Sequence, residues 1–136
     1  MATLILLFPL RTPVVPSWTV LVTDPSGAPI VGAVVRQQWK YEPFDSERHE
    51  ASDMTRENGA ASFPSRNLRM CLAERAFGLA MGLLRREAHP DWGRYSLIVA
   101  AAPGFQAASV AYQPGELLPV VIRLRRLVNS EPVVTQ

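Results

Sequence analysis

The sequence predicts a mainly β protein, a seven-stranded antiparallel β-sandwich with one helical insertion at about residues 68–87. Short stretches of alternating apolar and polar residues are separated by turn signals at intervals of about eight to twelve residues. One longer stretch interrupts this pattern with strong helix formers. A chain of 136 residues, 48% of them hydrophobic, is long enough to form one such domain around a buried core.

The clearest strand is residues 18–23. Trp18, Val20 and Val22 fall on one side of a pleated strand and the intervening residues fall on the other, so one face suits a core. The next four residues, Asp-Pro-Ser-Gly, place proline and glycine where a tight turn favours them, and the aspartate side chain can cap the turn. The chain is therefore predicted to reverse direction after this strand.

Further strands and a hairpin are predicted between residues 32 and 63. Residues 32–40 alternate so that one face carries Ala33, Val35, Gln37 and Trp39. Residues 41–53 are polar and mixed in charge, without a helical or strand period, and are predicted to form a mobile loop. The pair Asn58-Gly59 supplies the positive φ that a hairpin turn needs, so two short strands should flank it.

Residues 68–87 are predicted to form the helical insertion, with Asn67 as its N-cap. Its apolar stripe consists of Leu68, Leu72, Ala76, Leu79 and Leu83, widened by Met70, Phe77 and Leu84. A face this wide is expected to be covered by the rest of the protein. Gly78 and Gly82, four residues apart, are assigned to ordinary packing rather than to a close backbone contact.

The last third of the chain returns to strands. Residues 94–101 are predicted to form a strand that is buried largely on both sides, and residues 105–112 and 118–125 form two more. These boundaries predict one β-sandwich domain at residues 18–127 and a frayed tail at residues 128–136.

The N-terminal residues 1–17 are predicted to lie outside this domain. Residues 9–16 carry three prolines, which favours an extended linker. The apolar residues 4–8 resemble the core of a signal peptide but lack a positively charged start and an Ala-x-Ala cleavage site. A remnant export signal, an extra edge strand and a docking tail are three open alternatives. The apolar stretch is too short for a transmembrane span.

Charge and cysteine content exclude several classes of function. The 14 basic and 12 acidic residues give a net charge of +2 without a basic stripe that carries interleaved aromatic residues, so no nucleic-acid partner is predicted. The single cysteine, Cys71, excludes a disulfide framework and a CxxC metal site. It is predicted to be a buried, inert thiol.

Three segments, in this order and at hairpin spacing, carry a family resemblance. They are Val20-x-Val22-x-Asp24-x-x-Gly27-x-Pro29-Ile30-x-Gly32-Ala33-x-Val35, then Thr55-x-x-Asn58-Gly59-x-x-x-Phe63, and then Tyr95-x-Leu97-x-Val99-x-x-x-Pro103-Gly104-Phe105. From residue 18 to about residue 127 the chain resembles the carboxypeptidase regulatory-like domain of the transthyretin-like (prealbumin-like) sandwich group. The resemblance implies a seven-stranded, Ig-like sandwich, usually outside the cytoplasm, that serves as a non-catalytic accessory module.

Two features depart from this group. The family's hairpin normally runs straight on to the next strand, whereas residues 68–87 insert a helix that is expected to cover an edge strand. The 5-hydroxyisourate hydrolases of the wider group use several histidines, an arginine and a C-terminal Tyr-Arg-Gly-Ser ending. This chain has two histidines and ends in Glu-Pro-Val-Val-Thr-Gln, so that activity is not expected.

The candidate chemistry is sparse. His49, Glu50 and Asp53 are metal-ligand types, but a fourth ligand is missing and a solvated loop is favoured; His89 beside Asp91 has no nearby nucleophile. No catalytic residue, metal or cofactor is therefore predicted. Aromatic residues outside strands or at strand ends are candidates for surface recognition, namely Trp39, Tyr41, Phe44 and Trp92.

The sequence thus predicts a non-catalytic structural or protein-interaction module of the cell envelope or exterior, and not an enzyme. The alternative is a carbohydrate-binding module that uses the loop aromatics. The expected partner is accordingly a protein or a surface glycan. The expected location is extracytoplasmic, either periplasmic, at the cell surface or secreted, with an incomplete export signal near the start of the chain.

Overall fold

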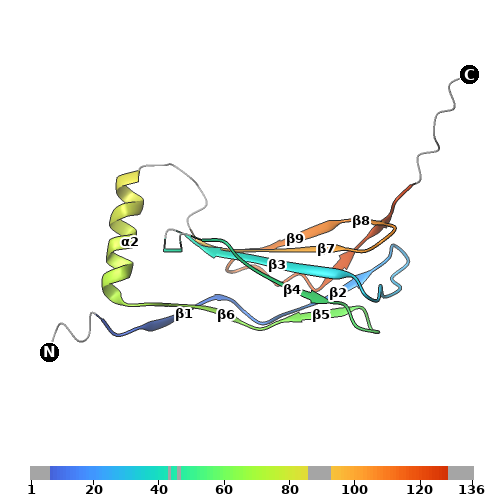
Figure 1. Cartoon of the computed structure of the whole chain (residues 1–136), viewed down its shortest axis with the longest axis horizontal. Coiled ribbons are helices and arrows are strands. Elements are labelled where there is room, and N and C mark those ends of the chain that lie inside the picture. Colours follow the sequence, from blue (N-terminus) through green and yellow to red (C-terminus); the bar gives the residue numbers. More distant parts are fainter. Residues whose placement is uncertain (1–6, 43, 46, 86–92, 129–136) are drawn as a thin grey trace, which may run out of the picture.

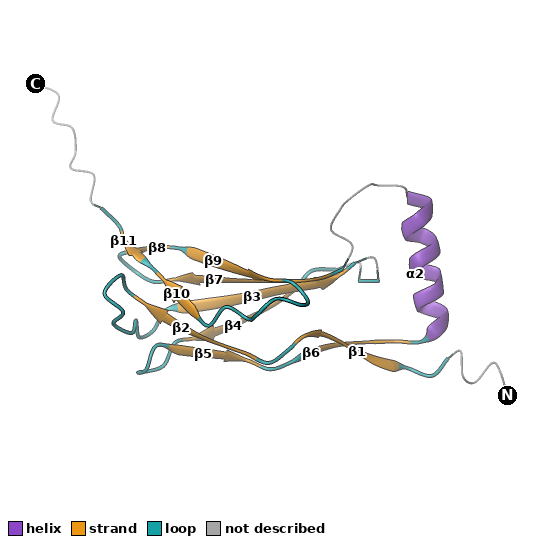
Figure 2. Ribbon diagram, turned by 180° about the vertical axis from the view of Figure 1, so that it is seen from behind, coloured by secondary structure: helices purple, strands orange, loops and turns teal. Residues whose placement is uncertain are grey.

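The computed structural model describes residues 7–42, 44–45, 47–85 and 93–128. These residues form a β-sandwich with one helix, which confirms the predicted fold class (Figures 1 and 2). In chain order the elements are β1 (Leu10–Val15), β2 (Trp18–Thr23), β3 (Val34–Tyr41), β4 (His49–Met54), β5 (Ala60–Phe63), β6 (Arg66–Met70), α2 (Leu72–Arg85), β7 (Arg94–Ala101), β8 (Phe105–Gln106), β9 (Ala108–Tyr112), β10 (Val121–Arg123) and β11 (Arg125–Arg126).

Two facing sheets make up the sandwich. One has the strand order β4-β3-β7-β9 and the other has the order β10-β2-β5. Within the described residues these two sheets hold seven strands, but β10 runs parallel to β2, so the pairing is not antiparallel throughout as the sequence predicts. Two strand pairs extend the sandwich at opposite ends, β1 with β6 and β8 with β11 (Figure 1).

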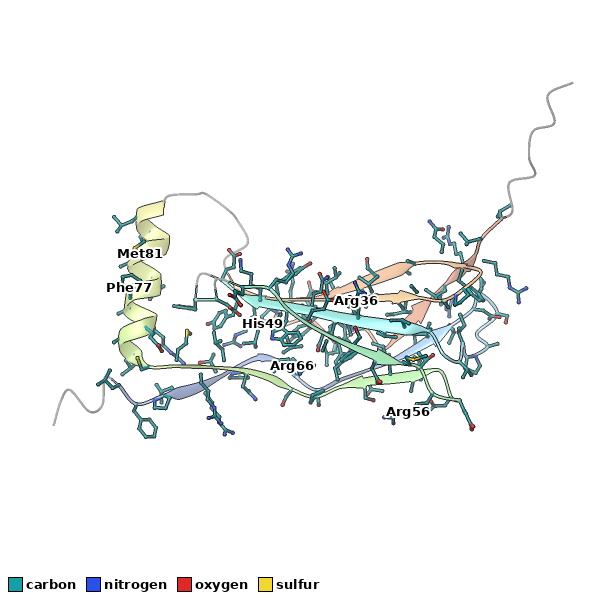
Figure 3. The ribbon with its side chains drawn as sticks, in the orientation of Figure 1. Arg36, His49, Arg56, Arg66, Phe77 and Met81 are labelled. Atoms are coloured by element: carbon teal, nitrogen blue, oxygen red, sulfur yellow. The ribbon has the colours of Figure 1, made fainter. Side chains whose placement is uncertain are left out.

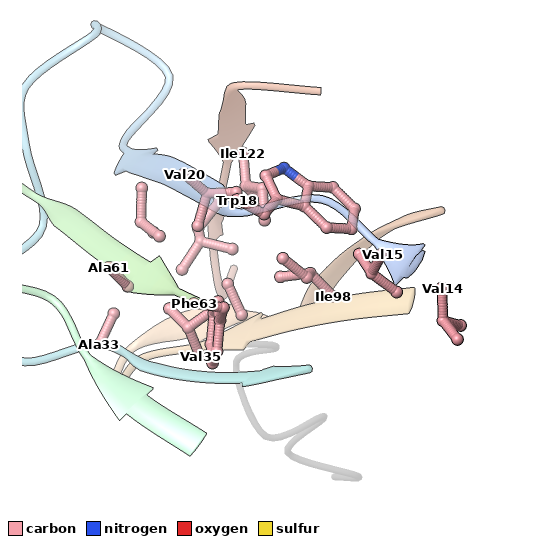
Figure 4. Packing of buried hydrophobic residues seen from close by; sticks show 13 residues of the cluster. Val14, Val15, Trp18, Val20, Ala33, Val35, Ala61, Phe63, Ile98 and Ile122 are labelled. Atoms are coloured by element: carbon pink, nitrogen blue, oxygen red, sulfur yellow. The ribbon is translucent and has the colours of Figure 1, made fainter. Parts of the chain in front are cut away.

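Strand β2 supplies the centre of the core, as its alternating pattern predicts. Trp18, Val20 and Val22 are fully buried, whereas the residues between them are exposed or partly exposed. The Trp18 indole nitrogen donates a 2.7 Å hydrogen bond to the carbonyl oxygen of Pro119, so its one polar group is satisfied inside the sandwich. Figure 4 shows the side chains of Trp18 and Val20 packed between the two sheets.

The facing sheet completes the core with one face only. Val35 on β3 and Ile98 on β7 are fully buried, and Ala33 and Gln37 lie on the same side as Val35, as predicted. The prediction that residues 94–101 are buried on both sides is wrong. Tyr95 is exposed on the other face of β7, because none of the described elements forms a layer over that side of the sheet.

The prediction of a mobile loop at residues 41–53 is wrong for the second half of that segment, which forms β4. This strand pairs antiparallel with β3, from Val34 opposite Met54 to Trp39 opposite His49. Cross-strand charges support the pairing, since Arg36 Nε lies 3.0 Å from Glu50 Oε1. The polar composition that suggested a loop is that of an edge strand facing solvent.

The two predicted turns are confirmed. Asp24 accepts hydrogen bonds from the Ser26 hydroxyl group at 2.5 Å and from the backbone amide groups of Ser26 and Ala28 at 2.8 and 3.0 Å. The bond from the Ser26 side chain is the main cause that lowers the pKa of Asp24 below its usual value. Gly59 has a φ of 75°, and a Cβ atom there would lie 2.8 Å from Pro29 Cβ, so the hairpin requires glycine.

Strands β1 and β6 continue the ladder of β2 and β5. Val15 pairs with Arg66 and, three residues further on, Trp18 pairs with Phe63 in the same antiparallel sense. The result is one long two-stranded ribbon whose inner half belongs to the sandwich. Its outer half extends toward the helix (Figures 1 and 2). We call residues 7–15 and 66–85, which form this outer half and α2, the arm.

Two expectations are corrected by the arm. The proline-rich linker at residues 9–16 is strand β1, which accommodates Pro13 at an irregular step in its ladder and pairs on one side only. The helix begins at Leu72 instead of residue 68, so Asn67 lies inside β6 and is not the N-cap. Pairing with β1 overrides the helical propensity of residues 68–70, and such long-range pairing is invisible to a local pattern.

Candidate interaction surface

Helix α2 stands at the end of the arm and has a defined start. The Cys71 amide donates to Glu74 Oε2 at 2.8 Å, and the Glu74 amide lies 3.5 Å from Cys71 Sγ, which is the reciprocal arrangement of a capping box. Cys71 is therefore the N-cap, and it is half-buried rather than buried as predicted. This cap also engages the exposed carboxylate of Glu74 in the first turn of the helix.

The face of α2 turned toward the sandwich is narrow, and the half-buried residues of the helix are Arg75, Gly78, Met81 and Gly82. A Cβ atom at Gly78 would lie 3.0 Å from the Phe44 side chain, so the glycine allows the aromatic ring to approach the helix backbone closely. The Arg75 guanidinium contacts the Thr12 hydroxyl group of β1. The close contact at Gly78 is made by the ring of Phe44 and not by another backbone, which agrees with the interpretation of this glycine as ordinary packing.

The opposite face of α2 is apolar and exposed. At about 100° per residue, the exposed apolar residues occupy an arc about 160° wide, and they are Leu72, Ala73, Ala76, Phe77, Leu79, Ala80, Leu83 and Leu84. Phe77 and Leu83 are each 69% exposed and Leu84 is 78% exposed. The expectation that this face is covered is wrong, because the helix packs through its small residues. Figure 3 shows Phe77 on the helix, clear of both sheets.

Further exposed apolar residues lie at the foot of the helix. Leu7 and Phe8, at 65% and 64% exposed, precede β1, whose first residue Leu10 pairs with Met70 next to the start of α2. The described part of the N-terminal segment thus runs into a strand of the arm. Among the described residues, no helix is long and apolar enough to cross a membrane.

Comparison with known proteins leaves the family open. No protein-family model and no curated protein matches this chain. A solved structure that matches is 3-chlorocatechol 1,2-dioxygenase from Rhodococcus opacus 1CP. The match has 15% sequence identity and a TM-score of 0.46, and it covers 86% of this chain and 62% of the dioxygenase chain. This chain therefore spans less than two thirds of the length of the structure that it matches.

The expectation that this chain is not an enzyme is corrected at this point. The matching solved structure is an enzyme, which contradicts that expectation, and we withdraw it. A match at this TM-score gives no argument for any particular activity of this chain.

The predicted aromatic site is largely engaged inside the molecule. Trp39 stacks on His49 with ring centroids 5.5 Å apart, and the Arg66 guanidinium carbon lies 4.3 Å from the Trp39 ring centroid. The Arg66 Nε group also donates to Gln37 Oε1 at 3.2 Å, and partial burial lowers the pKa of this arginine. Trp39 of β3 thus joins the arm to the sandwich through its contacts with His49 of β4 and Arg66 of β6.

The other predicted aromatics continue this connection toward the helix. Tyr41 meets Phe44 edge to face at 5.1 Å, and the Arg94 guanidinium lies 5.4 Å from the Tyr41 ring centroid. Phe44 in turn packs on Gly78 of α2. Trp92, His89 and Asp91 lie outside the described residues. Surface recognition through these aromatics stays a prediction, and the described contacts give it no support.

The three candidate metal ligands of β4 have separate partners. His49 Nε2 lies 2.7 Å from Asp45 Oδ2, and Glu50 pairs with Arg36. Asp53 Oδ2 accepts a 3.0 Å hydrogen bond from the Ser62 amide of β5 and so links the two sheets. Within the part of the chain that the structure describes, no group of three or more histidine, cysteine, aspartate or glutamate residues is arranged to hold a metal ion.

The arginines of the arm were not among the site residues predicted from the sequence. Arg11 of β1 pairs directly with Arg69 of β6, and both side chains are exposed. Like charges directly opposite each other destabilise a strand pair, so this arrangement has an energetic cost in the isolated domain. Residues 10–15 show no regular alternation of apolar and polar residues, and the prolines there favoured a linker, so no local pattern indicated this pairing.

Proposed function

We propose that this chain is an interaction module of the cell envelope or exterior, in which the β-sandwich supports the arm and α2 docks on a partner surface. The observation that carries this proposal is the orientation of α2, which packs through Gly78 and Arg75 and presents Phe77, Leu83 and Leu84 to solvent. Contiguous exposed apolar residues of this kind mark interaction sites.

The energetics favour docking through this face. Burying one large apolar side chain that is otherwise exposed contributes about 1.5–3 kcal/mol. Phe77, Leu83 and Leu84 alone therefore offer several kcal/mol to a partner, before the ordering costs of association are subtracted. The same face contributes little to folding of the isolated domain.

The family resemblance supports the extracytoplasmic location of this proposal. Domains of the carboxypeptidase regulatory-like group usually lie outside the cytoplasm, and this chain resembles them from residue 18 to about residue 127. Cell fractionation combined with the intact mass of the native protein tests this part. A cytoplasmic protein that retains Met1 would contradict the extracytoplasmic location.

The docking role is tested by fractionating cells that express the double variant Phe77→Glu with Leu83→Glu. We expect the parent protein to sediment with the cell envelope and the double variant to be released. The matched control is Met54→Glu with Leu117→Glu, because Met54 and Leu117 are also exposed, at 58% and 96%, but lie on the sandwich. Release of both double variants, or of neither, would contradict docking through α2.

A further inference from the structure

The partner surface can be specified from the charge of the arm, and this step rests on the docking role proposed above. Residues 7–15 and 66–85 contain five arginines and one acidic residue, Glu74, which gives them a formal charge of +4. The whole chain has a formal charge of only +2, so the remainder is negative. Arg66 and Arg75 make contacts within the domain, whereas Arg11 and Arg69 are exposed on the β1–β6 ladder next to the start of α2.

Among the described residues, neither Arg11 nor Arg69 forms an ion pair within the domain. Arg11 and Arg69 are exposed and face each other across the β1–β6 ladder. The acidic residue nearest to them in the arm, Glu74, is already bonded to the amide of Cys71. An anionic surface would relieve the repulsion between the two guanidinium groups, since each could bind a separate acidic group.

We propose that α2 and the foot of the arm bind an anionic phospholipid surface. An apolar helix face beside arginines is the pattern by which a helix lies in the interface of a bilayer, with the cations at the level of the acidic headgroups. A helix of 14 residues is about 21 Å long, which is enough to lie in the interface and too short to cross the hydrocarbon core. Leu7 and Phe8 supply a second apolar contact at its foot.

A second copy of the chain is the less favourable occupant of this face. A two-fold contact through α2 would use the same patch on both copies, because such an interface is self-complementary. It would therefore bring two arms of formal charge +4 together and add repulsion to that between Arg11 and Arg69. An acidic lipid surface removes this repulsion.

The proposal is tested by co-sedimentation of the purified full chain with vesicles. One set is phosphatidylcholine alone and the other is phosphatidylcholine mixed with an equal amount of phosphatidylglycerol. We expect binding to the mixed vesicles to be at least roughly tenfold tighter and to weaken as salt is added. Phe77→Glu with Leu83→Glu should abolish binding to both sets, whereas Met54→Glu with Leu117→Glu should bind like the parent.

The arginines are tested separately from the helix. Arg11→Gln with Arg69→Gln should reduce binding to the mixed vesicles by roughly tenfold or more and leave the weak binding to phosphatidylcholine unchanged. Thermal melting of every variant near the parent temperature verifies folding, because all the substituted side chains are exposed.

Three results would overturn the proposal. They are absence of vesicle binding, equal binding to both vesicle sets, and a concentration-dependent dimer in light scattering that the Phe77→Glu with Leu83→Glu variant abolishes. If the parent still sediments with the cell envelope through α2 but does not bind vesicles, the docking role stands and the lipid partner is wrong. If α2 variants remain in the envelope fraction, the docking role itself is wrong.

Discussion

Strand β2 and helix α2 are both rich in apolar residues, but these side chains are buried in β2 and exposed on α2. Trp18, Val20 and Val22 are at most 1% exposed, whereas Phe77 and Leu83 are 69% exposed. The difference lies in which face meets the rest of the chain. Strand β2 packs through its large side chains and α2 packs through Gly78. Hydrophobic composition therefore does not determine which residues are buried. Burial depends on which face of the element contacts the rest of the chain.

The largest expected change in the free energy of unfolding comes from a substitution in β2. Trp18→Ala should lower the free energy of unfolding by about 3–5 kcal/mol, because it leaves a cavity between the sheets and removes the partner of the Pro119 carbonyl oxygen. Urea unfolding followed by circular dichroism measures this loss. Trp18→Phe is the control, and it should lose less. A loss below about 1 kcal/mol for the alanine variant would place Trp18 outside the core.

An intermediate change in stability is expected from a substitution where α2 contacts the sandwich. Gly78→Leu would force its side chain against Phe44, which lies 3.0 Å from the Cβ position, and should cost about 1–3 kcal/mol or displace the helix. Hydrogen exchange of the helix amides would detect the displacement. Ala80→Leu, on the exposed side of the same helix, should leave both stability and exchange unchanged. Equal behaviour of the two variants would mean that the helix is not held through Gly78.

The smallest change in the free energy of unfolding is expected from a substitution on the outward face of α2. Phe77→Asp should change the free energy of unfolding by no more than about 0.5 kcal/mol, since the ring is 69% exposed and its removal leaves no cavity. Thermal melting of the purified variant tests this. A loss of about 3 kcal/mol would show that the helix face is buried, which is the result that the breadth of the apolar stripe alone predicts.

The sequence was informative where structure is local. Alternation identified β2 and its buried face, and turn chemistry identified the turns at Asp24 and Gly59, because each depends on a few neighbouring residues. It was uninformative where structure depends on distant partners. Strand β1 has a proline in its middle and exists because β6 lies beside it, which no local pattern reveals.

The candidate surface was only partly predictable. The apolar stripe of α2 was visible in the sequence, but periodicity gives the position of a stripe and not the direction in which it points. That direction is set by Gly78 against Phe44 and by Arg75 at Thr12, and both contacts join residues far apart in the chain. The arginines of the arm were missed for the same reason, since their proximity arises from the β1–β6 register.

The position of α2 has a mechanical consequence. The helix and β11 lie at opposite ends of the molecule, and the strands between them run along its length (Figure 1). A pull applied to the start of α2 and to β11 enters the sandwich through β6 and β5 and leaves through β10, and β2 lies between β5 and β10 in the sheet. Inter-strand hydrogen bonds run across the strands, perpendicular in the antiparallel β2–β5 pair and slanted in the parallel β2–β10 pair. This load therefore shears both ladders of β2 at once instead of peeling them bond by bond. A module held at α2 would therefore resist tension along its long axis better than tension across it.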